Sequence, residues 1–426
     1  MSELTAVVLA GGIGTRFLPY VTDKTLFPFL GESLLTRTLK MIAKAGIKQV
    51  IVATNGVNHA WLEPLLFTEF SGLNIQLHRQ SQPQGMGDAL LSVRSLLPDK
   101  DILVMNAGDM VAPHLLAGLL PSIEGKYAVV TGMETQVYQP LGYFVLEGNS
   151  VVGIQEKPGA DNMPSNVANL VFHYFSDPGK FLTLIEEANQ RSTGDDIYEQ
   201  ALTELMRQHE VSLFRYIGPW QKLKYGHHVL DMCEYFLRQM ENHIDVTAQI
   251  AKTAVIHGPV QIAAHAKILD QAVIQGPAYI GEDVVIGNNA LVRGSVIEHN
   301  SVIGYSSEIV RSYVGPECDL HHAYVGDSVL ENGVHFGYNA HTTNLRFDRQ
   351  PIEVKLPNQR IESGKTKLGA LIAKGSEVGA NSTLTPGVTL GANSLVYAGS
   401  LVYSPVPDDS TLKNHQEQII TKNEVL

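Results

Sequence analysis

The sequence predicts an α/β domain on an open, largely parallel sheet, followed by a parallel β-helix. Two periodicities carry this prediction. In the first half of the chain, short apolar runs alternate with segments of helical apolar spacing, which is typical of a sheet covered by helices. From residue 250 onward an aliphatic residue recurs at every sixth position, a period that matches neither a helix nor an isolated strand. Repeats of one short strand plus a turn, three to a coil, are typical of a β-helix.

The first strand is the apolar run at residues 5–10, which stops at two glycines, as a buried parallel strand does. The expected elements follow in the order strand 5–10, helix 33–46, strand 49–54, helix 88–97 and strand 101–105. This alternation predicts helices on both faces of the sheet. Mixed strands complete the domain through residue 218.

The hexad series marks the second domain. It runs through Ile250, Ile256, Ile262, Ile268, Ile274, Ile280, Ile286 and Val292, and returns at Ile372, Val378, Leu384, Leu390, Val396 and Val402. Glycine often follows the aliphatic residue, which predicts corners with unusual φ angles, at Gly281, Gly287, Gly304, Gly379 and Gly391. Residues 344–367 break the register and are rich in charge. We expect a loop there, and long loops in compact domains are usually functional.

Helical apolar spacing over residues 228–243 predicts a helix between the two domains. The expected organisation is an α/β domain at 1–227, a linking helix at 228–245, the β-helix at 246–404 and a C-terminal tail at 405–426. Each of the two domains is long enough to bury a sizeable core.

The composition is that of an ordinary soluble globular protein, since 44% of the 426 residues are hydrophobic and 17% are charged. The net charge of −12, without a Lys or Arg run, excludes nucleic acid as a general partner but leaves room for a small anionic substrate. No apolar run approaches the roughly 18 residues of a membrane span, so no membrane partner is expected. Cys233 and Cys318 lie far apart and no signal peptide is evident, so we expect a cytoplasmic protein.

A glycine-rich loop follows the first strand. It reads Leu9-Ala10-Gly11-Gly12-Ile13-Gly14-Thr15-Arg16. Glycines directly after a buried strand let backbone N–H groups approach a polyphosphate and form an anion nest. A dinucleotide fingerprint would need glycine where Phe17 stands, and a Walker loop would need Gly-Lys-Ser/Thr. The loop therefore predicts a phosphate site of another kind.

Further motifs follow the loop in order. They are Lys24 before an apolar stretch with Pro28, Gln80 with Gly85-Met86-Gly87-Asp88-Ala89, Gly108-Asp109, Gly142, Gln155-Glu156-Lys157-Pro158, and Asn169. In this order and with about these separations, the motifs resemble those of the sugar-1-phosphate nucleotidylyltransferases over roughly 220 residues. One such motif alone would be weak, whereas the ordered series is a specific match.

The resemblance implies a Rossmann-like fold and the Mg²⁺-dependent reaction of an NTP with a sugar 1-phosphate to give an NDP-sugar and pyrophosphate. All reactants are anionic, so the implied catalytic groups are cations: Arg16 at the leaving phosphates and Lys24 at the α-phosphate. Asp109, at the end of a strand, is the implied metal ligand. The implied nucleotide-binding residues are Leu9, Ala10, Gly11, Gly12, Gly14, Thr15, Gln80 and Gly85. The implied sugar-binding residues are Gly142, Glu156, Lys157 and Asn169.

Two positions depart from the family pattern. Lys222 stands where the family carries a second metal-binding carboxylate or amide, and a cation cannot ligate Mg²⁺. Either another group completes the coordination or catalysis is weakened. Val171 stands near a family glycine, and its side chain would narrow the sugar pocket.

The hexad domain resembles the left-handed β-helix of acyltransferases, and more closely that of the bifunctional enzymes that make UDP-N-acetylglucosamine, including archaeal-type relatives. The match at His321, Tyr324 and Asn344 implies a histidine base that deprotonates glucosamine 1-phosphate for attack on acetyl-CoA. Tyr338 and Asn339 replace smaller family residues at the preceding corner and would obstruct the acyl donor. The β-helix domains of related proteins form trimers, so a homotrimer is expected.

The expected substrates are UTP and N-acetylglucosamine 1-phosphate, followed by dTTP or UTP with glucose 1-phosphate, and the residues do not determine base or sugar. Two alternatives stay open. One is a bifunctional enzyme whose β-helix also transfers acetyl groups. The other is a non-catalytic sugar-nucleotide sensor or scaffold, which Lys222 and the Tyr338-Asn339 corner favour.

Overall fold

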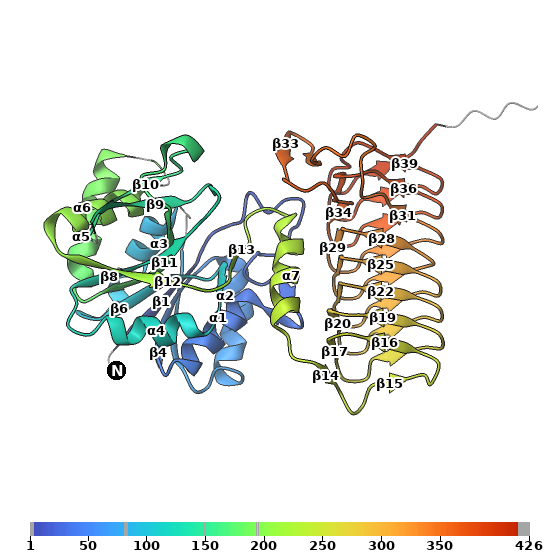
Figure 1. Ribbon diagram of the computed structural model, residues 1–426, viewed down its shortest axis with the longest axis horizontal. Coiled ribbons are helices and arrows are strands. Elements are labelled where there is room, and N and C mark those ends of the chain that lie inside the picture. Colours follow the sequence, from blue (N-terminus) through green and yellow to red (C-terminus); the bar gives the residue numbers. More distant parts are fainter. Residues whose placement is uncertain (1–3, 81–83, 149, 193, 195, 416–426) are drawn as a thin grey trace, which may run out of the picture. The chain divides into compact units, whose positions relative to one another are not determined.

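The computed structural model describes residues 4–80, 84–148, 150–192, 194 and 196–415 (Figure 1). The chain forms two compact units. The division falls between Lys222 and Leu223, except that the short segments Thr15–Thr22 and Pro28–Gly31 belong to the second unit. The chain therefore passes between the units several times near its start.

The first unit is built on a mixed β-sheet. Its strands in spatial order are β10 (Ser150–Glu156), β9 (Gly142–Glu147), β11 (Val167–Phe175), β6 (Ile102–Asn106), β1 (Thr5–Ala10), β4 (Gln49–Thr54) and β5 (Asn74–Arg79), with β8 (Ala128–Glu134) joining β11 to β12 (Val211–Tyr216). β1 pairs in parallel with β4 and β6, whereas β11 runs antiparallel to β6. β1 and β4 have the predicted bounds, and β6 begins one residue later than predicted.

Alternate side chains of β1 enter two separate apolar cores. Val7 and Leu9 lie in one core, and Ala6 and Val8 lie in the other. The first core is covered by α3 (Met86–Ser92), α5 (Pro178–Arg191) and α6 (Ile197–Gln208), and the second by α1 (Leu34–Lys44), α2 (Gly56–Leu62) and α4 (His114–Ser122). The prediction of helices on both faces is therefore confirmed. The predicted helix 88–97 is divided between α3 and a 3₁₀ turn at Arg94–Leu96.

The second unit contains a parallel β-helix made of three sheets, which is called the rod below (Figure 1). One sheet stacks β14 (His243–Ile244), β17 (Val260–Ile262), β20 (Ala278–Ile280), β23 (Val296–Ile297), β26 (Tyr313–Val314), β29 (Val329–Leu330), β34 (Leu371–Ile372) and β37 (Thr389–Leu390). The next stacks β15 (Gln249–Ile250), β18 (Lys267–Ile268), β21 (Val285–Ile286), β24 (Val302–Ile303), β27 (Asp319–Leu320), β30 (His335–Phe336), β35 (Glu377–Val378), β38 (Leu395–Val396) and β40 (Thr411–Leu412). The third stacks β16 (Val255–His257), β19 (Val273–Gln275), β22 (Leu291–Arg293), β25 (Glu308–Val310), β28 (Tyr324–Gly326), β31 (His341–Thr342), β36 (Thr383–Leu384) and β39 (Leu401–Val402).

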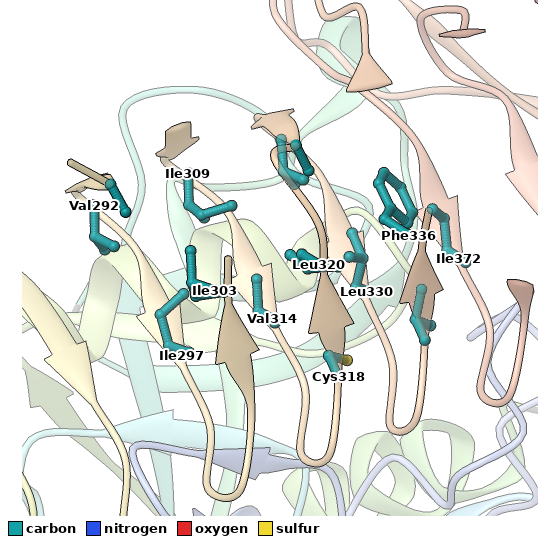
Figure 2. Close-up of a cluster of buried hydrophobic side chains, with 14 of the residues drawn as sticks. Val292, Ile297, Ile303, Ile309, Val314, Cys318, Leu320, Leu330, Phe336 and Ile372 are labelled. Atoms are coloured by element: carbon teal, nitrogen blue, oxygen red, sulfur yellow. The ribbon is translucent and has the colours of Figure 1, made fainter. Parts of the chain in front are cut away.

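The register of these strands confirms the predicted repeat. Ile262 pairs with Ile280, eighteen residues on, and Ile250, Ile268 and Ile286 stack in one row. Their side chains point inward, and Figure 2 shows part of the continuous core that they form, with Phe336 as its one aromatic member among the described residues. Cys318 lies in the same core, and its thiol is free.

The glycines after the hexad aliphatics do not have the unusual φ angles that the sequence predicted. Positive φ falls two residues later, at Asp283 (55°) after Gly281 and at Asn289 (58°) after Gly287. The glycine is required for space, because a Cβ on Gly281 would lie 2.7 Å from the backbone nitrogen of His299 in the next coil. The prediction of unusual φ angles was therefore wrong. The hexad pattern does not reveal how closely successive coils approach, and this close approach is what requires the glycines.

The charged segment that breaks the hexad register forms an antiparallel hairpin, β32 (Glu353–Leu356) with β33 (Gln359–Glu362). The side chains of Val354 and Leu356 are buried, and Lys355 forms a β-bridge with Val388 of the rod. The expected loop is thus a folded hairpin packed on the β-helix.

The predicted linking helix is α7 (His228–Gln239), which belongs to the second unit, and the first strand of the β-helix follows it at His243. The sequence predicted that the β-helix ends at residue 404. It continues to β40, which pairs with β38, and Leu412 still packs against the core. Residues 416–426 of the expected tail lie outside the described residues. No helix in the described ranges is long and apolar enough to cross a bilayer.

The two early segments of the second unit are built into it by ring contacts and hydrogen bonds. The Phe29 ring centroid lies 5.6 Å from that of Phe236 on α7 and 6.0 Å from that of Tyr313 on β26. The carboxylate of Glu331, which is buried, accepts a hydrogen bond from the Thr22 backbone N–H at 2.9 Å. A second buried carboxylate, that of Glu298, accepts one from the Gly31 N–H at 3.0 Å.

Candidate functional site

Two buried asparagines fix the glycine-rich loop after β1. Asn55 and Asn58 form a capping box at the N-terminus of α2. The Asn58 side-chain amide donates to the carbonyl oxygen of Ala10 at 2.7 Å, and that of Asn55 donates to Gly12 at 3.2 Å. The carbonyl groups of the loop are therefore held by α2.

The same asparagines hold the segment that carries Lys24. Asn55 donates to Asp23 Oδ2 at 2.5 Å, and Asn58 donates to Thr25 Oγ1 at 3.2 Å. The loop and the lysine segment are thus fixed to one another through α2. Asn55 and Asn58 were not among the predicted site residues, because no local motif marks them.

Gln80 lies directly against the glycine-rich loop. A Cβ on Gly11 would overlap the Gln80 side-chain oxygen, so a larger residue there would displace the Gln80 amide. The Gln80 Nε2 donates to the Asp88 carboxylate on α3, which leaves Oε1 directed at the loop as an acceptor. Gly85, with a φ of 100°, immediately precedes α3.

Lys24 and Asp109 meet at the carboxyl edge of the sheet, where ligands of open α/β sheets bind. Asp109 begins β7 (Asp109–Val111), just after β6, and a Cβ on Gly108 would lie 3.5 Å from Lys24 Nζ. β7 pairs with β13 (Trp220–Lys222), which places Lys222 directly opposite Asp109. The Asn106 side-chain amide donates to Asp109 Oδ2 at 3.2 Å.

Burial raises the pKa of Asp109 above its usual range, and the positive charges of Lys24 and Lys222 oppose this rise. One carboxylate fits a divalent cation that takes its other ligands from substrate phosphates and water. The pair of acidic ligands implied by the family pattern is not present at this pairing, because Lys222 occupies the second position.

Three of the predicted sugar-binding residues lie on neighbouring strands. Gly142 of β9 pairs with Glu156 of β10, and a Cβ on Gly142 would lie 3.0 Å from Glu156 Oε2. Lys157 Nζ lies 2.9 Å from Glu156 Oε1. Asn169 is on β11, which also pairs with β9. Val171, which was expected to narrow the sugar pocket, is buried in the apolar core of the first unit.

A buried histidine orients Asn169. His173 lies on the same face of β11, and its Nε2 is 2.8 Å from Asn169 Oδ1 while its Nδ1 is 2.9 Å from the Tyr198 hydroxyl. Burial lowers the pKa of His173 to about 3, so the ring is neutral and has one N–H. The Tyr198 hydroxyl donates to Nδ1 and the Nε2–H donates to Asn169, which leaves the Asn169 NH₂ group as a donor.

Glu199 on α6 is a buried acid that the sequence did not indicate. Burial raises its pKa to about 8, and the negative charge of Glu156 adds to the rise. Both carboxylates line a cavity of about 320 Å³, together with Arg191 and Arg207. Glu156 therefore belongs to a larger polar cavity.

The remaining predicted nucleotide residues fall into both units. Leu9 and Ala10 are buried at the end of β1, and Gly14 has a φ of 67°. Thr15 and Arg16 belong to a segment of the second unit. The first unit by itself therefore holds Lys24 but not Arg16.

On the β-helix, two of the three predicted acetyl-transfer residues share a polar cluster. The Asn344 amide nitrogen lies 3.4 Å from the Tyr324 hydroxyl and 2.5 Å from Asp327 Oδ2. Asp327 also accepts two hydrogen bonds from Arg311, at 2.7 and 2.6 Å. The cluster links three successive coils.

His321 has different partners. Its Nε2 lies 3.4 Å from Asp319 Oδ2, and within the described ranges no hydrogen bond joins it to Tyr324 or Asn344. The altered corner is filled by an aromatic stack in which the His322 ring centroid lies 5.1 Å from Tyr338 and 5.3 Å from Tyr305.

Fold and site together define a nucleotidyltransferase joined to a hexapeptide-repeat β-helix. Residues 5–223 match the family described as nucleotidyl transferase, and residues 259–294 match the bacterial transferase hexapeptide (six repeats). The first match covers more than half of the chain, and the chain belongs to the nucleotidyl transferase family. The second match agrees with the predicted left-handed β-helix.

The chain is similar over nearly its whole length to curated bifunctional proteins. It is 31% identical to the bifunctional protein GlmU of Methanococcus maripaludis strain C7, over 98% of this chain and 99% of that protein. It is 28% identical to the bifunctional sugar-1-phosphate nucleotidylyltransferase/acetyltransferase of Sulfurisphaera tokodaii, over 94% and 97%. An apo UDP-glucose pyrophosphorylase structure covers 55% of this chain and 98% of its own, with a TM-score of 0.50 at 17% identity, which shows a shared fold.

Proposed function

We propose that this nucleotidyltransferase converts an NTP and a sugar 1-phosphate into an NDP-sugar and pyrophosphate, with UTP and N-acetylglucosamine 1-phosphate as the favoured pair. UTP or dTTP with glucose 1-phosphate comes next. The observation that carries the proposal is the approach of Lys24 to Gly108 and Asp109 at the carboxyl edge of the sheet, with the glycine-rich loop fixed to the same segment. This arrangement supports a phosphate site at the loop, with the Lys24 ammonium beside it.

In the proposed reaction an oxygen of the sugar phosphate bonds to the α-phosphorus, and the bond from that phosphorus to the β-phosphate oxygen breaks. Negative charge develops on the oxygens around the phosphorus, so catalysis depends on positioning and on fixed cations. Lys24 offsets charge at the α-phosphate. Backbone N–H groups of Gly11, Gly12 and Gly14 hold the phosphates, and Arg16 offsets charge on the leaving pyrophosphate.

The position of Gln80 favours a nucleotide whose base has an N–H group on its edge. The Gln80 amide nitrogen is already bonded to Asp88, so Oε1 is the atom that faces the loop. Uracil and thymine carry an N3–H donor that such an acceptor can bind, whereas cytosine lacks this donor. The arrangement therefore favours UTP and dTTP over CTP.

Asp109 would hold the divalent cation, which we propose is Mg²⁺. A single carboxylate plus substrate phosphates is a normal Mg²⁺ arrangement. When bound, the cation would supply positive charge that offsets the charge of the phosphates. The positive charges of Lys24 and Lys222, which both interact with the Asp109 carboxylate, would offset further negative charge on the substrate phosphates.

The test is pyrophosphate release from the purified protein with each of four NTPs and a panel of sugar 1-phosphates, in the presence of Mg²⁺. We expect release with UTP and N-acetylglucosamine 1-phosphate. Release only with glucose 1-phosphate would correct the sugar. Nucleotide binding by calorimetry without turnover of any pair would instead establish the non-catalytic sensor.

Replacing His173 with Phe should raise the KM for the sugar 1-phosphate about 10-fold, because Asn169 and Tyr198 each lose a buried partner and the amide is no longer oriented. The KM for the NTP should stay within about 2-fold of wild type. The matched control is His209→Phe, since the His209 ring stacks on that of Tyr127 with centroids 4.1 Å apart, and no hydrogen bond or ring contact among the described residues joins it to Asn169. Equal effects of both variants on both KM values would contradict the orienting role of His173.

Acetyl transfer to glucosamine 1-phosphate is the second candidate function, and the cluster of Tyr324, Asn344 and Asp327 favours it. We expect this activity to be weak or absent. His321 pairs with Asp319, and the Tyr338 stack occupies the corner where the acyl donor would approach. A reacting thioester must come within about 3–3.5 Å of the amine, and a misplacement of about 1 Å costs on the order of 10²-fold.

The assay for this prediction is CoA release from acetyl-CoA with glucosamine 1-phosphate, in wild type and in Tyr338→Ala/Asn339→Gly. A gain in the double variant would locate the block at this corner. Strong wild-type activity that is lost in His321→Ala would show the expectation to be wrong and the protein to be bifunctional.

A homotrimer in the cytoplasm completes the proposal. Coils of a β-helix present flat aliphatic faces that neighbouring rods can cover. Light scattering should give a mass near three times 46.5 kDa. A monomer at micromolar concentration would contradict the trimer.

A further inference from the structure

Three metal-binding side chains gather on one outer face of the β-helix. Asp319 of β27 pairs with His335 of β30 in the next coil, and His321 follows β27 directly. Leu320 and Phe336 are buried in the core, so their neighbours along the strand point outward. Asp319, His321 and His335 are therefore on the same side of the rod.

The donor atoms have the spacing of a coordination site. His321 Nε2 lies 3.4 Å from Asp319 Oδ2, and His335 Nδ1 lies 3.9 Å from the same oxygen. All three donor atoms lie within 4.8 Å of one another. Ligands bonded at about 2.0–2.1 Å in a tetrahedral zinc site are about 3.3–3.4 Å apart, so small rotations would bring these atoms to bonding distance.

A surface ion pair does not account for this geometry as well. Such a pair needs one imidazole, whereas here two imidazoles converge on a single carboxylate oxygen. The backbone holds the two histidines in place: the N–H of His321 donates to Phe336 O at 3.0 Å, and that of His335 donates to Ser376 O at 3.0 Å. Parallel strands of successive coils keep a spacing of about 4.8 Å, so the site is built on rigid elements.

We propose that Asp319, His321 and His335 bind a divalent transition-metal ion of the zinc class. Two imidazole nitrogens and one carboxylate suit zinc, cobalt or nickel, whereas Mg²⁺ prefers oxygen ligands alone. The three side chains are about half exposed, which leaves the fourth position to water or to an exchangeable ligand. The site differs in chemistry from the cation site at Asp109 and does not depend on the proposed nucleotidyl transfer.

Metal binding would also change what His321 can do. A metal on Nε2 occupies the lone pair that a general base uses to accept a proton. Acetyl transfer through this nitrogen and metal occupancy are therefore mutually exclusive. Wild-type protein loaded with zinc should show less CoA release than metal-free protein if any such activity exists.

The test is a Co²⁺ titration of the full chain, followed by the visible absorption bands of tetrahedral cobalt, with Zn²⁺ as the competitor. We expect the tetrahedral bands to saturate at one Co²⁺ per chain and to be lost when Zn²⁺ displaces it. His335→Gln and Asp319→Asn should each weaken binding by at least about 10-fold, since even the loss of an outer-shell partner costs about 10–100-fold. His299→Gln, at an exposed histidine elsewhere on the rod, should bind as wild type does.

Thermal unfolding of each variant shows whether it is folded, and the substituted side chains are on the surface. The proposal is overturned if folded wild type gives no tetrahedral cobalt spectrum. It is also overturned if both ligand variants titrate like wild type, or if His299→Gln weakens binding as strongly as they do.

Discussion

Lys24→Ala should lower the kcat/KM of nucleotidyl transfer by about 10²–10³-fold, which is the usual loss when one fixed electrostatic stabiliser is removed. The physical reason is the position of the Lys24 ammonium beside Gly108 and Asp109, where it offsets charge that grows on the α-phosphate. Folding should be unaffected, because Asp23 and Thr25 keep their hydrogen bonds to Asn55 and Asn58. Pyrophosphate release under kcat/KM conditions measures the effect.

The matched control for Lys24 is Lys48→Ala, which removes an exposed ammonium of the same unit. It should leave the rate within about 2-fold of wild type, as expected for a surface substitution. Turnover of Lys24→Ala at the wild-type rate would remove Lys24 from the site. A rate loss of equal size in both variants would indicate a general charge effect.

Asp109→Asn should lower kcat/KM by about 10²-fold or more and raise the Mg²⁺ concentration needed for half-maximal rate. The substitution keeps the shape of the side chain but removes a carboxylate that interacts with the positive charges of both Lys24 and Lys222. The two ammonium groups then lose an anionic partner that offsets their positive charge. The bound cation loses a ligand as well, so its affinity falls. Initial rates across an Mg²⁺ series separate the loss of metal affinity from the loss of rate.

Asp99→Asn serves as the control for Asp109, because Asp99 is an exposed carboxylate of the same unit. Lys222→Asp is the informative partner, since it places a second carboxylate opposite Asp109 across the β7–β13 pair. It should lower the Mg²⁺ requirement. An Asp109→Asn variant with the Mg²⁺ dependence of wild type would contradict the assignment of Asp109 as the metal ligand.

The rod could be predicted in detail because one residue type at a fixed spacing determines both the strand and its register. Ile250, Ile268 and Ile286 stack in one row as the hexad series indicates. The reason for the corner glycines could not be predicted, because the approach of Gly281 to His299 is a contact between coils. The hairpin β32–β33 was also missed, since its buried side chains are recognisable only from the surface that they cover.

The residues of the candidate site also fall into those that the sequence predicts and those that it does not. Lys24, Gln80 and Asp109 occur in local motifs, so their types and order indicated their place before any contact was known. The residues that hold the glycine-rich loop and Asn169 do not occur in such motifs, because Asn58 contacts Ala10 across 48 positions of sequence and His173 contacts Tyr198 across 25. Lys222 was recognised as an exception, but its pairing with Asp109 follows from the β7–β13 register.

The early segments of the second unit limit where the gene could recombine without disrupting the packing of the protein. Asp23–Phe27, which carries Lys24, is a short return to the first unit between two stretches that fold with the rod. Phe29 on one of these stretches packs on Phe236 and Tyr313, far along the chain. A recombination event at residues 222–223 would keep Lys24 with the first unit but separate Phe29 from both of its ring partners. A cut at this position would divide the second unit, so one domain cannot be exchanged there without removing the ring contacts of Phe29.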